Sequence, residues 1–234
     1  MTLASIVPTR DRCFPVDDAV SAMLPDAGLV RGRVVGCTGP AAMSLSLGLA
    51  ARATVTGSWL AAVGVPMLGV EAVAEFGVPL SRLVAIDAGG GPSAWAERVG
   101  AAADGFDLIL TRPPSGAERV VKKIKQRLQA RGVVLFAVGP TTPGMSCDVE
   151  FSTSSVEWVG LGEGHGSLLG RRAVVRVGGR RVPRPVEREL WLPGPAGGLA
   201  AVERPEREWA PDEPAQPDDE TGHDRPLEVL GRAG

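Results

Sequence analysis

Several residue types are scarce in this chain, and each shortage argues against a class of protein. Its 234 residues contain no tyrosine or asparagine and few lysines, cysteines or histidines. The cysteines, Cys13, Cys37 and Cys147, have neither CxxC spacing nor a neighbouring histidine, which argues against a disulfide framework or a zinc site and predicts buried thiols. His165 and His223 have no partner cluster, so we expect neither a metal centre nor a histidine base.

Long apolar runs are missing as well. No stretch has the length needed to cross a bilayer, and the N-terminus lacks the basic segment followed by an apolar core that marks a signal peptide. We therefore expect a cytoplasmic protein with no membrane contact. Apolar residues still make up 44% of the chain, which is enough for one buried domain of ordinary size and a tail.

The charge is small overall and unevenly distributed. The net charge of −2 combines a mildly basic body with an acidic C-terminal part, because ten acidic residues and only four arginines occur from Glu203 onward. The body is too weakly basic to indicate nucleic-acid binding by itself. From about Pro193 the chain is rich in proline, glycine and acidic residues, a composition that predicts a flexible tail.

Short apolar runs alternate with helical patterns over residues 33–138, which predicts an α/β fold with a mainly parallel sheet flanked by helices. The predicted strands cover residues 33–37, 58–63, 83–87, 107–111 and 133–138. The predicted helices cover residues 44–53, 70–76, 93–103 and 115–131. In the last helix Ser115 and Glu118 have the spacing of a capping box, and Gly132 is the expected C-cap.

Two further strands are predicted over residues 148–161 and 171–181, with a glycine-rich turn between them. We expect them to add to the C-terminal edge of the parallel sheet as antiparallel strands. The predicted organisation is an N-terminal segment over residues 1–19, a domain over residues 20–192, and an acidic, proline-rich flexible tail over residues 193–234.

The first predicted strand is followed by a segment with the position and length of a phosphate-binding loop. Its residues are Gly39, Pro40, Ala41, Ala42, Met43, Ser44, Leu45 and Ser46. In the working pattern GxxxxGK[ST], backbone amides and the lysine hold the phosphates, and the final hydroxyl binds Mg²⁺. Serine replaces the second glycine here and leucine replaces the lysine, so the segment is a degenerate nucleotide loop.

The sequence on both sides of this loop resembles the RecA-type ATPase core. The segments that look like strands and helices of that core are residues 29–35, 74–84, 107–110 and 126–138. Within this superfamily the chain resembles the ImuA group, the RecA-related accessory proteins of bacterial mutagenic repair cassettes, over residues 20–195. The segments that carry this likeness are residues 24–29, 31–32, 57–59, 64–66 and 191–193.

The same resemblance indicates which catalytic groups are missing. Residues Asp107, Thr111 and Arg112 belong to a degenerate Walker B strand, in which the family's acidic residue aligns with Arg112. An arginine there would repel Mg²⁺. The position of the catalytic glutamate of RecA falls near Val65. We therefore expect no ATPase activity, no cofactor and no catalytic residue.

Other candidate residues lie toward the C-terminus. A candidate basic surface consists of Arg171, Arg172, Arg176, Arg180 and Arg181, because alternation along this strand directs some of these side chains outward. Edge strands also use charge to prevent aggregation, so direct DNA contact is the weaker interpretation. Trp191 and Trp209 are candidate partner-binding aromatics, with packing on the domain as the alternative for Trp191. Trp59 is predicted to lie in the core.

The resemblance to ImuA proteins implies a function in damage-induced mutagenesis, a part of the SOS response to DNA damage. It implies a non-catalytic adaptor of translesion DNA synthesis that binds an ImuB-type, inactive Y-family polymerase homologue and helps to assemble the error-prone C-family polymerase complex. RecA is a further candidate partner, and the assembled protein would be nucleoid-associated. A SulA-like inhibitor of cell division, a regulator of RecA filaments and a nucleotide-dependent enzyme with an atypical loop remain as alternatives.

Overall fold

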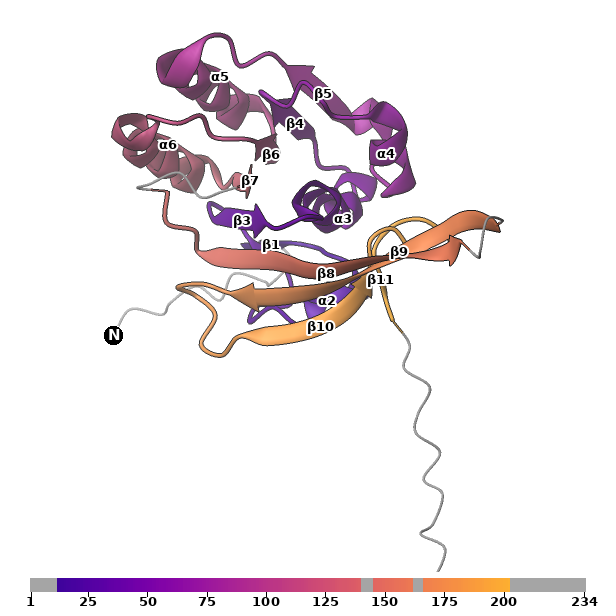
Figure 1. Ribbon diagram of the computed structural model, residues 1–234. Coiled ribbons are helices and arrows are strands. Elements are labelled where there is room, and N and C mark those ends of the chain that lie inside the picture. The colour runs from indigo at the N-terminus through magenta and orange to yellow at the C-terminus, as the bar shows by residue number, and fades with distance from the viewer. Residues whose placement is uncertain (1–11, 140–144, 162–165, 203–234) are drawn as a thin grey trace, which may run out of the picture. The chain divides into compact units, whose positions relative to one another are not determined.

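The computed structural model describes residues 12–139, 145–161 and 166–202. These residues form a nine-stranded mixed sheet with helices on its faces, in the strand order β11-β10-β9-β8-β3-β7-β6-β4-β5 (Figure 1). The expected α/β class, with a large sheet flanked by helices, is therefore confirmed.

Five parallel strands form one half of the sheet. They are β3 (Val34–Thr38), β7 (Val134–Val138), β6 (Leu108–Thr111), β4 (Leu60–Val63) and β5 (Leu83–Ile86). The five strands predicted in this region are confirmed to within two residues at each end. All except the edge strand β5 are buried along most of their length, which explains why their sequences are continuously apolar rather than alternating.

Helices pack against both faces of this parallel half (Figure 1). They are α3 (Ala42–Val55), α4 (Val70–Glu75), α5 (Gly91–Gly105) and α6 (Glu118–Arg131), with the short 3-10 helix η1 (Leu80–Arg82) before β5. Val34 packs in the core beneath α5 and α6, whereas its neighbour Val35 packs in the core that contains α3. Because successive strand residues point to opposite faces, β3 contributes to both cores.

The other half of the sheet consists of β8 (Val149–Leu161), β9 (Gly166–Gly178), β10 (Val186–Trp191) and β11 (Ala200–Ala201). β8 pairs in parallel with β3, and the antiparallel pairs of this half are β8 with β9, β9 with β10 and β10 with β11. The expectation of an antiparallel addition is therefore wrong for its first strand, because a hydrophobic pattern carries no information about strand direction.

The start of β9 also differs from the predicted strand over residues 171–181. Gly166 pairs with Leu161, and Gly170 pairs with Val159, so residues assigned to a turn are part of a hairpin ladder. Cross-strand pairing here overrides the low strand propensity of glycine. β10 was not predicted because charged residues occupy its centre, and β11 was missed because it has only two residues.

A small antiparallel pair lies before the main sheet. β1 (Cys13–Phe14) pairs with β2 (Leu29–Val30), and the short helix α2 (Asp18–Ser21) lies between them in sequence. Phe14 is buried in the core that also contains α3 side chains. The described part of the N-terminal region is therefore packed on the domain.

The predicted capping box at the start of α6 is wrong. The helix begins at Glu118, with Ala117 as its N-cap and without a capping hydrogen bond from a side chain. Gly116 has a φ of +81° and turns the chain between Ser115 and the helix, which removes the serine from the capping position. The C-terminal prediction is confirmed, because Gly132 is the C-cap in the left-handed conformation.

Trp59 is not a core residue, contrary to the prediction. It precedes β4, which begins one residue later, and it is 39% exposed. Its backbone still bonds to β6, because its carbonyl accepts from Leu108 N–H at 3.0 Å. Its ring packs against the Arg82 guanidinium, whose central carbon is 5.1 Å from the ring centroid.

The three thiols are buried, as predicted. Cys13, Cys37 and Cys147 are free cysteines and at most 8% exposed. Burial raises the pKa of each thiol, and raises that of Cys147 to about 11. They are therefore neutral packing groups at physiological pH.

Some predictions concern residues outside the described ranges. These are His165, His223, Trp209 and the tail from residue 203 onward. Residues 193–202, by contrast, are described: β11 pairs with β10, and Leu199 is buried. Within the described ranges, no helix combines the length and the apolar character needed to cross a membrane.

Candidate functional site

The candidate nucleotide loop lies at the carboxyl end of β3, where the chain enters α3. The turn consists of Gly39, Pro40 and Ala41 only. α3 begins at Ala42 and includes the remaining predicted loop residues, which are Met43, Ser44, Leu45 and Ser46. Strand-to-helix turns of this kind are common anion sites because their amides point toward the ligand. The amides and side chains of this short turn therefore decide whether a phosphate could bind.

β8 fills one side of the turn. The hydroxyl of Thr153 accepts a hydrogen bond from Ala41 N–H at 3.0 Å and donates one to the Thr38 carbonyl at 3.1 Å. Gly39, at φ +90°, packs so closely on this strand that a Cβ would lie 2.1 Å from the Thr153 carbonyl oxygen. The next amide is also engaged, because Ala42 N–H donates to the Gly39 carbonyl at 3.2 Å. The amides of Ala41 and Ala42 are thus satisfied within the protein.

The side chains that replace the lysine and magnesium ligand of the motif point into the protein. Leu45 is 0% exposed and belongs to the core that includes α3. Ser46 is also 0% exposed, and its hydroxyl donates to the Met43 carbonyl at 2.7 Å. Neither side chain is available to a ligand at the mouth of the turn.

Arg171 on β9 reaches the first turn of α3. Its guanidinium donates to the Ser44 hydroxyl and, at 2.6 Å, to the Leu192 carbonyl, and it lies over the Trp158 ring at 5.0 Å from the centroid. Burial lowers the pKa of Arg171, and the charge of Glu75 opposes this shift. This cation near the degenerate loop therefore fastens β9 to α3.

The three degenerate Walker B residues are not brought together. Thr111, at the carboxyl end of β6, is buried, and its hydroxyl accepts a hydrogen bond from the Trp95 indole N–H at 2.7 Å. Arg112 follows it and is exposed. Asp107 precedes β6 at the opposite end, where its carboxylate accepts from Trp59 N–H at 2.9 Å.

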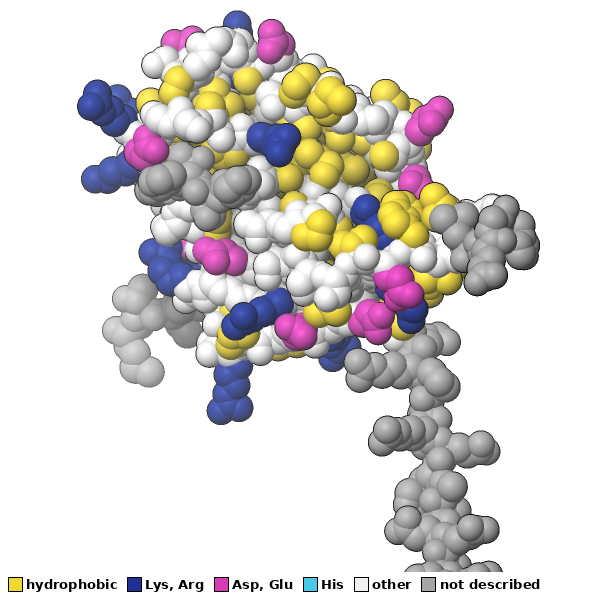
Figure 2. All heavy atoms as spheres, in the orientation of Figure 1, with side chains coloured by type: hydrophobic (Ala, Val, Ile, Leu, Met, Phe, Trp, Pro, Cys, Tyr) yellow, Lys and Arg dark blue, Asp and Glu magenta, His cyan; other side chains and the backbone are white. Residues whose placement is uncertain are grey.

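The five arginines of the candidate basic surface fall into two groups, one in the middle of β9 and one toward and beyond its C-terminal end. Arg171 is bound as described, and Arg172 lies 2.8 Å from Glu157 and 3.8 Å from Glu189. The predicted alternation is correct, since Ala173, Val175 and Val177 are buried between outward-facing residues. The other group contains the exposed residues Arg176, Arg180 and Arg181. On the face of the molecule drawn in Figure 2, Lys and Arg side chains are interspersed with Asp and Glu side chains rather than gathered in one patch.

Asp148, immediately before β8, is a buried ionisable residue that the sequence analysis did not single out. It is 1% exposed, accepts from Val34 N–H at 3.2 Å and pairs with Arg180 at 2.9 Å and with Arg33 at 3.5 Å. Burial alone would raise the pKa of Asp148, but the Arg180 and Val34 hydrogen bonds and the Arg33 charge hold it below its ordinary value. In the sequence, Asp148 follows the apolar Cys147 and precedes a strand, as turn residues commonly do. Nothing in the local sequence therefore indicates that its side chain is buried and ion-paired.

Trp191 lies near the end of β10 and is half-buried, between the fully buried Leu190 and Leu192. The Arg172 guanidinium is 5.9 Å from its ring centroid. The sequence analysis gave packing on the domain as the alternative to partner binding for this segment. The two buried leucines do pack on the domain. Whether Trp191 also binds a partner stays a prediction.

The polar groups of the loop region are engaged by other protein groups. The cation near it is bonded to protein groups, the hydroxyls are internally bonded, and the described residues include no group of three His, Cys, Asp or Glu side chains that could hold a metal ion. The polar side chains around the loop therefore make contacts within the protein in this structure.

Comparison with models of known protein families gives a match. The family model described as the MT3502 N-terminal domain matches residues 22–144. This range includes the loop, the strands β4 to β7 and the helices α3, α5 and α6. No curated protein matches the chain.

Proposed function

The chain belongs to the MT3502 N-terminal domain family, and from its closed loop we propose that it is a non-catalytic, RecA-like adaptor of the ImuA type. In this proposal it binds an ImuB-type, inactive Y-family polymerase homologue and helps to assemble an error-prone C-family polymerase complex during damage-induced translesion synthesis. The polymerases would supply the chemistry, and this chain would supply binding surfaces.

The observation that carries the proposal is the position of Thr153. Its hydroxyl satisfies the Ala41 amide in the turn where a working loop would offer amides to phosphate. A ligand phosphate would have to displace this hydroxyl and move a strand whose backbone already contacts Gly39. Because the protein's own strand β8 occupies the place of the phosphate, this contact favours a binding function over nucleotide hydrolysis.

Two further observations support the loss of catalysis. The buried Leu45 stands where the motif has lysine, and replacing it with a charged group would place that charge in an apolar core. Thr111, at the end of the candidate Walker B strand, has its hydroxyl bonded to Trp95 rather than directed at a metal site. The RecA-like interpretation itself is supported by the resemblance in sequence and by the turn that follows the central parallel strand.

A pull-down of the full-length protein from damage-induced cells, with bound proteins identified by mass spectrometry, tests the adaptor function. We expect recovery of an inactive Y-family polymerase homologue, with or without the error-prone C-family polymerase. Recovery of the tubulin-like division GTPase would instead favour a SulA-like inhibitor, and recovery of RecA alone would favour a filament regulator. Either of these results would refute the adaptor proposal.

Nucleotide measurements test the loss of catalysis separately. We expect no Mg²⁺-dependent ATP hydrolysis and no ATP binding by calorimetry for the purified full-length protein. Ser46→Ala is the matched variant, because this hydroxyl is the only polar side chain of the motif that remains at its expected place. Turnover in the wild-type protein that disappears in Ser46→Ala would refute the non-catalytic interpretation.

A further inference from the structure

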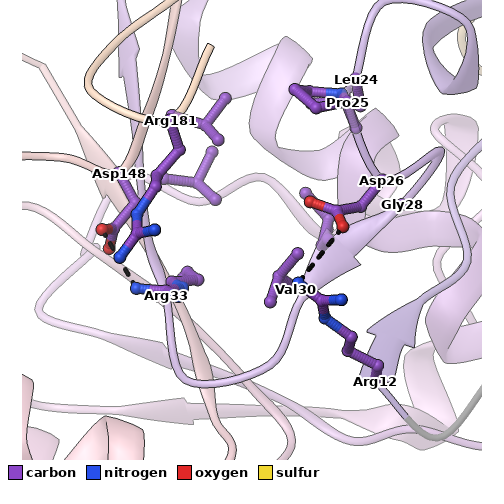
Figure 3. A pocket seen from close by; sticks show the side chains of 12 residues that line it. Arg12, Leu24, Pro25, Asp26, Gly28, Val30, Arg33, Asp148 and Arg181 are labelled. Carbon is purple, nitrogen blue, oxygen red and sulfur yellow. Dashed lines mark ion pairs between the residues drawn. The ribbon is translucent and has the colours of Figure 1, made fainter. Parts of the chain in front are cut away.

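A cleft lies at the amino end of β3 and β8, away from the degenerate loop. It has a volume of about 200 Å³ and is lined by the N-terminal region, β3, the start of β8 and the turn after β9 (Figure 3). Three arginines and two aspartates line it: Arg12, Arg33, Arg181, Asp26 and Asp148. The sequence analysis noted only Arg181 among these, as part of a basic surface.

The charged side chains form two walls that face each other. On one wall Arg33 and Arg181 lie together beside Asp148, and on the other Asp26 pairs with Arg12 at 3.5 Å (Figure 3). Each aspartate is already paired with an arginine. Among the described residues, the side chain of Arg181 has no hydrogen bond or ion pair, so the first wall carries surplus positive charge.

Asp148 holds the first wall in place. Its carboxylate links three elements, because it accepts from the Val34 amide of β3 and pairs with Arg33 and with Arg180 of the turn after β9. Its carbonyl also accepts from Arg181 N–H at 2.9 Å, which fixes the backbone of that arginine. A guanidinium on a fixed backbone needs less ordering to bind a carboxylate than one on a mobile loop.

The base of the cleft between the walls is apolar. Leu24, Leu29, Val30, Val35 and Val149 contribute to it. Leu24 and Val35 belong to the main core, so this base is rigid. A ligand that complements both parts needs a carboxylate beside an apolar group.

The size and the charges favour a peptide over a nucleic acid. The volume is below the roughly 300–1,000 Å³ of sites for drug-sized ligands, and it suits one or two amino-acid side chains. A nucleic acid presents successive phosphates and is bound by continuous positive charge. The carboxylate of Asp26 on the second wall interrupts such a surface and would repel the next phosphate.

We propose that this cleft binds a peptide segment of a partner protein in which an acidic residue stands next to an apolar one. The Asp or Glu carboxylate would bind Arg33 and Arg181, and the apolar side chain would pack on Leu24 and Val149. The proposal rests on the adaptor function, for which it supplies one binding surface. Arginine pairs carboxylates with two parallel hydrogen bonds. Arg33, whose side chain is 26% exposed, lies beside an apolar base, and arginines in such settings are typical energetic centres of protein interfaces.

Selection of short random peptides on the purified full-length protein tests this. We expect the enriched peptides to carry an acidic residue next to a Leu, Ile, Val or Phe. Their affinity, measured by fluorescence anisotropy, should fall roughly tenfold or more with Arg181→Gln, as expected for loss of a charge-assisted hydrogen bond. Replacing the peptide's acidic residue with its amide should weaken wild-type binding similarly and have little effect on Arg181→Gln.

Arg176→Gln is the matched control, since Arg176 is an exposed arginine of β9 that does not line the cleft. It should bind the selected peptides as the wild type does. Arg181→Gln removes no side-chain hydrogen bond or ion pair among the described residues and keeps the backbone bond to Asp148, so it should fold normally, which circular dichroism would verify. Equal loss in both variants, or enriched peptides without an acidic residue, would overturn the proposal.

A labelled single-stranded oligonucleotide distinguishes the other class of ligand. Oligonucleotide binding that is lost in Arg181→Gln, with no peptide enriched, would assign the cleft to nucleic acid and overturn the peptide proposal. The pull-down separates this test from the adaptor function. If wild-type and Arg181→Gln protein recover the polymerase homologue equally, the adaptor function is supported and the peptide site in the cleft is refuted. If peptides bind the cleft but no polymerase homologue is recovered, the peptide site is supported and the adaptor function is refuted.

Discussion

Thr153→Val is the most direct test of the closed loop. Valine has nearly the shape of threonine, so the change removes the hydroxyl while the packing around this 4% exposed side chain is kept. Two groups then lose a hydrogen bond: the Ala41 amide and the Thr38 carbonyl. Ala41 is 2% exposed, so its amide has little access to water, whereas Thr38 is half-buried and its carbonyl is more readily hydrated.

The expected loss follows from these exposures. Leaving a buried polar group unsatisfied costs about 1–3 kcal/mol, and most of that penalty applies to the Ala41 amide. We expect Thr153→Val to lower the free energy of unfolding by about 2–3 kcal/mol, with Tm falling by about 5–10 °C for a domain of this size. Urea unfolding followed by tryptophan fluorescence and far-ultraviolet circular dichroism measures the first quantity.

Thr153→Ser is the matched control, because it keeps the hydroxyl and removes only a methyl group. Its cost should be about 1 kcal/mol, the loss of one buried carbon. Hydrogen exchange adds a local readout, since the Ala41 amide should exchange faster in the valine variant than in the serine variant. A valine variant as stable as the wild type, or a serine variant that is less stable than the valine one, would refute the role given to the hydroxyl.

The other predictions concern three buried residues. Leu45→Lys restores the lysine of the motif but places an ammonium group in the core. We therefore expect the free energy of unfolding to fall by several kcal/mol and calorimetry to detect no ATP binding. A stable variant that binds Mg-ATP would contradict this. Asp148→Asn should cost about 2 kcal/mol in urea at neutral pH, because Arg33 and Arg180 lose a buried partner but remain partly hydrated. Since the pKa of Asp148 is lowered by folding, the wild type should keep this stabilisation above pH 3.8 and lose it progressively below, whereas the asparagine variant should show no such component. Cys147, whose pKa is about 11, should resist Ellman's reagent at mildly alkaline pH in the native protein and react fully when unfolded, and rapid native labelling would show that the thiol is accessible.

The parallel half of the sheet was predictable because its strands are buried on both faces. β6 and β7, for example, consist almost entirely of apolar residues, and helical patterns separate the strands. The substitution of Leu45 for the motif's lysine is also visible directly in the sequence. These features depend on residues close together in the chain, where periodicity and motif spacing carry the information.

The closing of the loop was not predictable in the same way. Thr153 lies 112 residues after Ala41, and their contact depends on the register between β3 and β8. Asp148 and Arg33 are likewise brought together only by that register. A local pattern could place Thr153 on a strand but could not indicate that its hydroxyl faces a turn formed by residues far earlier in the chain.

The position of β3 in the sheet also has a consequence for how the protein is synthesised. Both neighbours of β3 come late in the sequence: Val34 pairs with Leu135, and Val35 pairs with Val149. β4 and β5 can pair as soon as they leave the ribosome, but β3 has no sheet partner until β7 has emerged, more than half-way along the 234-residue chain. Long-range pairing of this kind slows folding and leaves apolar segments exposed meanwhile. The centre of the sheet is therefore expected to close late in translation, and the growing chain to depend on chaperones until it does.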